Sequence, residues 1–165
     1  SDELRRSARA LDLDDMVTTT ITATTDITPA IDGSSPASLH GGCFACGAGR
    51  GGGLALAFTI GPDGAATALW QPSAAFQGYA DRVHGGIIAT LLDSSIVHAL
   101  FARGVPGVTA DLSIRYRHAV GLGEPVRVTG WVESRRLGLY LCRAEVMQSG
   151  RVSVRATAKF AAIRG

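Results

Sequence analysis

The stretch RVHGGIIATLLDSSIVHALFARGVPG, residues 82–107, decides the fold. Its long apolar middle has no internal Gly or Pro, which predicts a helix. Gly85 and Gly86 mark the start of that helix. Gly104 and Pro106 mark its end, because Gly just past the last turn and Pro shortly after it are common helix stops. The helix is apolar on nearly all sides, so we expect other elements to enclose it.

Strand-like runs lie on both sides of this helix. Before it, LALAFTI (54–60) and AATALWQ (65–71) flank a Pro-Asp-Gly turn and predict a β-hairpin. After it come four more runs, at 108–120, 125–135, 139–148 and 151–163. The order of elements predicts an α+β fold, in which one long helix is wrapped by an antiparallel sheet of about six strands.

The first 38 residues differ from the rest of the chain. An acidic start is followed by a stretch rich in Thr, Ser and Pro that has little to bury, so we expect a partly disordered tail or linker. The folded domain is then expected over 39–165. Apolar residues make up 46% of the chain and charged residues 18%, which favours one packed domain there.

Charge is distributed unevenly. The net charge of +2 is too small to indicate nucleic-acid binding. Residues 1–40 carry seven acids against three arginines, whereas residues 115–159 carry nine basic residues against three glutamates. This asymmetry suits a phosphate-bearing ligand on the C-terminal half, although a solvated basic face of the sheet would give the same pattern.

Cysteine content and hydropathy bear on the compartment. An odd number of cysteines without a recognisable signal peptide leads us to expect reduced thiols in a cytosolic protein. The longest apolar stretch is interrupted by Asp93 and is shorter than the roughly 20 residues that span a bilayer, so no membrane association is expected.

HGGCFACG offers three residues at spacings found in zinc sites: His40, Cys43 and Cys46. A closed zinc site takes four ligands, and the remaining cysteine, Cys142, lies in a distant predicted strand. The sequence therefore predicts no metal, and the first two cysteines are expected to pack as small apolar residues.

Asp93 stands in the middle of the apolar helix. A buried carboxylate costs several kcal/mol unless it is paired, hydrogen-bonded or protonated. One interpretation is that Thr90 or Ser94 satisfies it from the same helix. The other is that it is a catalytic acid, base or nucleophile.

The start of the helix favours the catalytic interpretation. Backbone N–H groups at Gly85 and Gly86 lack partners within the helix and could hold a developing oxyanion, while His84 either orients this turn or caps it. Gly85 and Asp93 lie about 12 Å apart along one helix, which is too far for one carbonyl group. Two antiparallel copies would bring them together, so the site is expected at a two-fold interface and twice per dimer.

These residues resemble a known family. GYADRVHGGIIATLLDSS (78–95), with CFACG…GGLALAF before it and TADLSIRYRHAV…GEPVRVTGWV after it, resembles the hotdog-fold acyl-CoA thioesterases. The type is that of the phenylacetyl-CoA and 4-hydroxybenzoyl-CoA thioesterases, and the resemblance covers about residues 40–162. It implies a hotdog fold with active sites at dimer interfaces, often in tetramers. It also implies that Asp93 is nucleophile or general base and that the Gly85 N–H holds the thioester oxygen.

Two features of that family map less directly. A loop amide often helps to position water or substrate, and the nearest candidate is Gln77, although strict spacing falls on Gly78. A hydroxyl follows the acid by one helical turn in some members, where this chain has Val97.

The sequence thus predicts a homodimeric or dimer-of-dimers acyl-CoA thioesterase that needs no cofactor. Substrate contacts are expected from Thr90 and Ser94, and contacts to CoA phosphates from Arg115, Arg135 and Arg136. Two alternatives remain on the same scaffold: a non-catalytic acyl-CoA binding module, and a hotdog dehydratase or hydratase.

Overall fold

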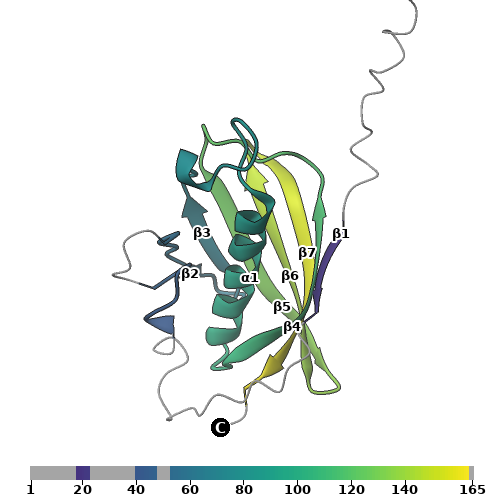
Figure 1. The fold of residues 1–165 in the computed structure, drawn as a ribbon. Helices are drawn as coiled ribbons and strands as arrows, with labels where there is room; N and C mark the ends of the chain where they lie inside the picture. Colours follow the sequence, from purple (N-terminus) through teal and green to yellow (C-terminus); the bar gives the residue numbers. More distant parts are fainter. Residues whose placement is uncertain (1–17, 23–39, 48–52, 164–165) are drawn as a thin grey trace, which may run out of the picture.

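The computed structural model describes residues 18–22, 40–47 and 53–163 of the chain. One antiparallel sheet of seven strands, in the order β1-β4-β7-β6-β5-β3-β2, curves around one long helix (Figure 1). The elements are β1 (Thr18–Thr22), β2 (Thr59–Ile60), β3 (Ala66–Trp70), the 3-10 turn η3 (Ala74–Phe76), α1 (Gly85–Phe101), β4 (Gly107–Tyr116), β5 (Val126–Arg136), β6 (Leu139–Gln148) and β7 (Arg151–Ala162). The predicted wrapped-helix architecture is confirmed.

Helix α1 begins and ends where its glycines predict. His84 is the N-cap, and its Nδ1 accepts from the Gly86 N–H at 2.9 Å. At the other end Gly104 has φ of +68°, and the Val105 N–H donates back to the Leu100 carbonyl at 3.0 Å. Among the described residues no helix has the length and apolar character needed to cross a bilayer.

The helix lies very close to β5. Gly130 faces Ser95 of α1, and a Cβ at this position would lie 2.5 Å from the Ser95 carbonyl carbon. Only a residue without a side chain allows the two backbones to approach so closely. This close contact sets the distance between α1 and the sheet, and so helps to position the side chains of α1, including Asp93.

Tight hairpins join the last three strands. Leu137–Gly138 and Ser149–Gly150 both have positive φ at two consecutive residues, as two-residue type I′ turns require. Along β7, Val154, Ala156 and Ala158 are buried while Arg155 and Thr157 between them are exposed.

The first strand of the predicted hairpin is much shorter than expected. The structure pairs only Thr59–Ile60 with β3, and the prediction of a strand from residue 54 is wrong. Ala55 has φ of +50°, which breaks an extended strand. The N–H groups of Leu54 and Leu56 instead donate to the carbonyls of Phe44 and Ala45, at 3.0 and 2.9 Å.

Part of the predicted tail joins the sheet. Residues 18–22 form β1, which pairs antiparallel with β4 at one edge, as the purple strand in Figure 1 shows. Residues 1–17 and 23–39 lie outside the described part of the chain, so the expected disorder of the tail and its boundary with the domain stay predictions.

Candidate active site

The carboxylate of Asp93 is held by a hydroxyl from the sheet. The Thr109 hydroxyl on β4 donates to Asp93 Oδ1 at 2.6 Å. This partner comes from neither of the residues considered from sequence, since the Thr90 hydroxyl donates to the Gly86 carbonyl at 3.0 Å. Asp93 is thus tied to β4 rather than satisfied within its own helix.

Asp93 faces a largely apolar pocket of about 420 Å³. Thr90, Ser94 and Val97 line it from the helix, and Thr109 and Leu112 line it from β4. The third wall comes from residues 40–45. The two predicted substrate residues, Thr90 and Ser94, therefore do lie beside the acid, in a cavity of the size that small ligands occupy.

This environment changes the acidity of Asp93. Burial among apolar groups raises its pKa above the ordinary value for aspartate, and the Thr109 hydrogen bond and the nearby His40 oppose that rise. A carboxylate with a raised pKa is a stronger base than an exposed one and suits proton transfer near neutral pH.

Two backbone N–H groups at the helix N-terminus, those of Gly85 and Gly86, differ in their partners. The His84 ring occupies the Gly86 N–H, as a capping residue does. Among the described residues no acceptor takes the Gly85 N–H. The Gly85 carbonyl accepts from the Tyr116 hydroxyl at 2.8 Å, which holds this turn against β4.

Gly85 and Asp93 line different cavities. Gly85 borders a second pocket of about 190 Å³, together with Arg82, Tyr116 and Arg117. The two residues are eight positions apart on α1, or about 12 Å at 1.5 Å per residue. Within one chain the acid and the Gly85 amide therefore do not meet at one carbonyl group.

Gln77 lines neither of these pockets. Its Oε1 accepts from the Asp81 N–H at 3.2 Å, and Asp81 itself has φ of +60°. The side chain thus stabilises the turn that leads into α1. Gly78 in the same turn comes close to His84, where a Cβ would lie 3.1 Å from the His84 Cα.

The three predicted phosphate-binding arginines are not grouped. Arg115 lies opposite Arg155 in the register of β4 and β7. Arg135 of β5 lies opposite Tyr140 of β6, and Tyr140 lies opposite Phe160 of β7. Phe160 in turn lies opposite Thr109 of β4, so Arg135 is at the same position along the strands as Thr109. Six residues of β4 separate the positions of Thr109 and Arg115, or roughly 20 Å. Arg115 lies near the N-terminus of α1, whereas Arg135 and Arg136 lie near the other end of the sheet.

Two basic residues that the sequence did not single out also lie near the start of α1. Arg82 and Arg117 line the Gly85 pocket. Their positions in the sequence could have indicated this, because Arg82 precedes the HGG motif and Arg117 follows Tyr116 directly.

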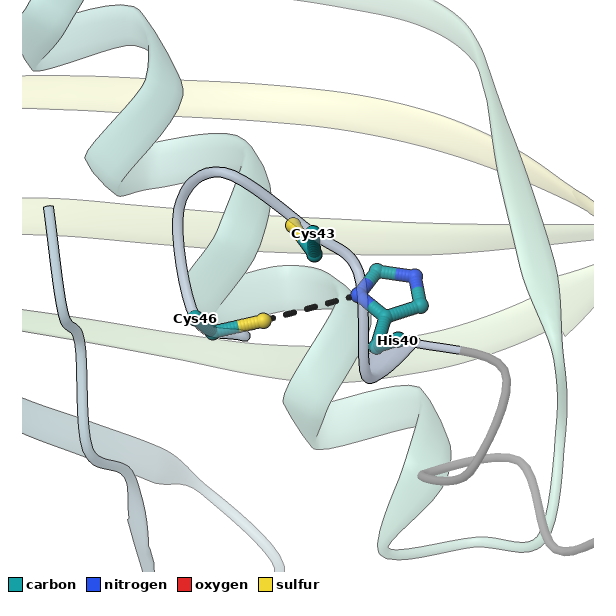
Figure 2. A group of neighbouring side chains, drawn as sticks. All are labelled: His40, Cys43 and Cys46. Carbon is teal, nitrogen blue, oxygen red and sulfur yellow. Dashed lines mark hydrogen bonds between the residues drawn. The ribbon is translucent and has the colours of Figure 1, made fainter. Parts of the chain in front are cut away.

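The turn at residues 40–47 brings His40, Cys43 and Cys46 together beside α1 (Figure 2). Their ligand atoms all lie within 4.8 Å of one another, and Cys46 Sγ is 3.5 Å from His40 Nδ1. Both cysteines pack against the hydrophobic core, as expected. Burial, together with Cys43, raises the pKa of the Cys46 thiol to about 12.

Residues 81–136 match the thioesterase superfamily. Human acyl-coenzyme A thioesterase 13 is 42% identical over 52 residues, which make up 30% of this chain and 37% of the human protein. This chain therefore spans little more than a third of the length of that curated relative. The matched superfamily segment contains α1 with Asp93, the whole of β4 and the whole of β5.

Solved structures share the fold. A thioesterase superfamily protein is 29% identical with a TM-score of 0.61, covering 64% of this chain and 55% of that one. The PaaI protein from the phenylacetic acid degradation operon of Escherichia coli is 17% identical, with a TM-score of 0.61 and coverage of 66% and 83%. A Streptococcus pneumoniae thioesterase protein solved with coenzyme A is 22% identical, with a TM-score of 0.61 and coverage of 65% and 87%. The hotdog fold and the resemblance to thioesterases are confirmed.

Proposed function

We propose that this chain, which has the hotdog fold of the thioesterases, hydrolyses an acyl-CoA thioester to a free acid and coenzyme A. One observation carries the proposal: a carboxylate in an apolar pocket, held at 2.6 Å by one hydroxyl, with its pKa raised by burial. Similarity to acyl-coenzyme A thioesterase 13 and to a thioesterase protein solved with coenzyme A supports the substrate class.

In the proposed reaction the Asp93 carboxylate removes a proton from water, and the resulting hydroxide adds to the thioester carbonyl carbon. The oxygen of the tetrahedral intermediate is held by a backbone N–H. The C–S bond then breaks, and the leaving sulfur takes the proton from Asp93. The raised pKa supports this role, because the same group must first accept a proton and then return it.

Direct attack by Asp93 is the second form of the same chemistry. The carboxylate would form an anhydride with the acyl group as the thiolate leaves, and water would then open that anhydride. A single turnover in ¹⁸O-water can identify the anhydride. Label in the Asp93 carboxylate requires attack of water on the Asp93 carbonyl of the anhydride, whereas label in the released acid fits both water activation and attack of water on the acyl carbonyl.

The oxyanion donor is proposed to come from a second copy of the chain. The Gly85 N–H of one subunit would face Asp93 of its partner across a two-fold axis, with the two helices antiparallel. Two observations support this arrangement. The Gly85 N–H takes no acceptor among the described residues, and it lies in a different pocket from the acid of its own chain.

Arg82 and Arg117 are proposed to contact the phosphates of coenzyme A. Both are exposed at the border of the pocket of Gly85, and guanidinium groups bind phosphate oxygens in pairs of hydrogen bonds. Arg115, Arg135 and Arg136 stay predictions, and the roughly 20 Å between their positions along the strands means that one phosphate group could not contact all three within one chain.

The decisive experiment is a panel of acyl-CoA substrates with detection of the released thiol, on the wild type and on Asp93→Asn. Loss of a general base costs about 10²–10⁴-fold in kcat, so the variant should fall at least 100-fold. Asp111→Asn is the matched control, because Asp111 lies on β4 near Thr109 but pairs with Lys159 at 3.4 Å on the surface. Equal loss in both variants, or turnover that survives Asp93→Asn, would remove Asp93 from the mechanism.

A further inference from the structure

Backbone hydrogen bonds within the turn at residues 40–47 hold it in one conformation. The Cys43 N–H donates to the His40 carbonyl at 2.9 Å, and the Gly47 N–H donates to the Cys43 carbonyl at 2.7 Å. A Cβ at Gly47 would lie 2.5 Å from the Cys43 carbonyl oxygen and 2.6 Å from that of Gly41. The backbone therefore folds back on itself so that the two cysteines face the same space.

The rest of the molecule holds this turn in place. Phe44 and Ala45 accept backbone hydrogen bonds from the segment at 54–56. The His40 ring packs edge-on against Phe101 of α1, with 4.8 Å between ring centroids, and also meets His98 edge-on at 6.4 Å. The imidazole thus has a fixed orientation, with Nδ1 directed at Cys46 (Figure 2).

One of the distances within the group equals a ligand-to-ligand distance in a zinc site. A tetrahedral zinc ion with Zn–S near 2.3 Å and Zn–N near 2.0 Å places its sulfur and nitrogen ligands about 3.5 Å apart. Cys46 Sγ and His40 Nδ1 are 3.5 Å apart, and all three ligand atoms lie within 4.8 Å of one another. Because the remaining separations are at most 4.8 Å, the side chains would have to move by about 1 Å to bind a single ion.

We propose that His40, Cys43 and Cys46 bind one Zn²⁺ ion in the wall of the pocket that contains Asp93. Thiolates and imidazole are the ligands that zinc prefers, and two thiolates neutralise a divalent ion in this half-buried position. Among the described residues no fourth His, Cys, Asp or Glu joins the group, so water completes the tetrahedron.

The prediction of no metal rested on the need for four protein ligands. Zinc sites with three protein ligands and a water also occur. His40 and Cys43 line the pocket of Asp93, so the ion would fix the wall that faces the substrate. The proposal gives the ion no part in the hydrolysis itself, and it stands or falls independently of thioesterase activity.

A disulfide between Cys43 and Cys46 is the competing use of the same two thiols. It would need neither the imidazole nor its distance from Cys46. The placement of His40 Nδ1 at a ligand-to-ligand distance therefore favours the ion over the disulfide.

The test uses the full chain, reduced, stripped of metal with a chelator and titrated with Co²⁺ and then Zn²⁺ without oxygen. Wild type should bind about one ion per chain, show thiolate-to-cobalt absorption that Zn²⁺ abolishes, and release protons on binding as the thiols ionise. Cys46→Ser and His40→Ala should each lower the affinity at least about 100-fold, since loss of an outer partner alone costs 10–100-fold. Cys142→Ala is the control, because this cysteine lies on β6 outside the group, and it should bind as wild type does.

Thermal unfolding separates binding from misfolding. Each stripped protein gives its own baseline, and added Zn²⁺ should raise the melting temperature of wild type and of Cys142→Ala only. If Cys46→Ser fails to fold, His40→Ala carries the test. No thiolate-to-cobalt band in reduced wild type, binding that is unchanged in His40→Ala, or a Cys43–Cys46 disulfide that persists under the reductant would each overturn the proposal.

Discussion

Asp93 depends on a hydroxyl that lies 16 residues away in the sequence. Leu112 and Ile114 of β4 face the helix, so simple alternation would place Thr109 on the opposite side of the sheet. A bulge between Thr109 and Asp111 reverses this, since Thr109 pairs with the buried Phe160 and Asp111 with the exposed Lys159. Strand bulges leave little signal in one sequence, so the acid was predictable and its partner was not.

Replacing Thr109 with valine should move the acid limb of the pH–rate profile. The hydroxyl lowers the pKa of Asp93, so its loss raises that pKa further, and the ionised form that acts as base appears only at higher pH. Below the new pKa, kcat/KM should fall roughly tenfold or more, because a hydrogen bond to a charged group contributes about 1.5–3 kcal/mol. Thr109→Ser keeps the donor and should retain the wild-type profile. Superimposable profiles for Thr109→Val and wild type would contradict this role.

The same acid should lower the stability of the fold at neutral pH. Burial raises the pKa of folded Asp93 above the unfolded value of about 3.9, so the wild type loses stability as pH rises from below that value through the folded pKa. Asp93→Asn keeps an acceptor for Thr109 without the charge. It should therefore melt higher than wild type at pH 7, by about 2–4 °C per kcal/mol gained, and the difference should vanish below about pH 3.9.

Asp111→Asn is again the control for that stability measurement. It removes an exposed ion pair with Lys159 and should not raise the melting temperature at pH 7. An Asp93→Asn variant that melts below wild type at neutral pH would show that the charged form is favoured in the folded protein.

Among the elements, the helix was predicted accurately because its ends carry strong local signals. The segment at 54–58 was wrongly predicted as a strand, although the alternation of its residues correctly indicated which side chains are buried. Leu54 and Leu56 are buried and Ala55 and Ala57 are exposed, as in a strand. Alternation predicts which side chains are buried, but it does not name the backbone that accepts the hydrogen bonds, and here that backbone is the turn at residues 40–47.

The contact between α1 and β5 gives a prediction about packing. Gly130→Ala places a Cβ 2.5 Å from the Ser95 backbone, where neither element can yield without displacing the other. The free energy of unfolding should fall by about 1–3 kcal/mol or more, as for other overpacked sites. Gly123→Ala is the control, because nothing lies within 4 Å of a Cβ there. Chemical denaturation of both variants measures the difference, and equal midpoints would contradict the close contact.

At the scale of the whole molecule, the separation of Gly85 from Asp93 gives the sharpest test of the proposed interface. Gly85→Pro replaces the amide hydrogen with a ring carbon and so removes the donor. Gly85 is the first residue of α1, where proline is tolerated, and the preceding His84 is already extended with φ of −61° and ψ of 134°. Gly85→Ala keeps the N–H, and its Cβ would meet Tyr116 at an ordinary 3.7 Å. We expect Gly85→Pro to lose about 10²–10³-fold in kcat, and Gly85→Ala to lose little.

Mixed oligomers then distinguish a shared site from a site within one chain. Gly85→Pro and Asp93→Asn subunits carry two different tags, are produced together and are purified through both tags. A site shared across a two-fold axis leaves one intact site in each mixed dimer, so activity should return to about half that of wild type. Mixed species as inactive as both parents would place the two residues in the same chain's site and end the interfacial arrangement.

The pocket is assembled from parts that can change separately. The acid and its hydroxyl come from α1 and β4, whose relative position is fixed by the sheet and by Gly130. The opposite wall comes from the turn at residues 40–47, which meets the segment at 54–56 through two backbone hydrogen bonds. Backbone bonds do not depend on side-chain identity, so substitutions at Phe44 could reshape the cavity while the reacting groups stay in place. The specificity for the acyl group of the substrate could therefore change in evolution while the catalysed reaction stays the same.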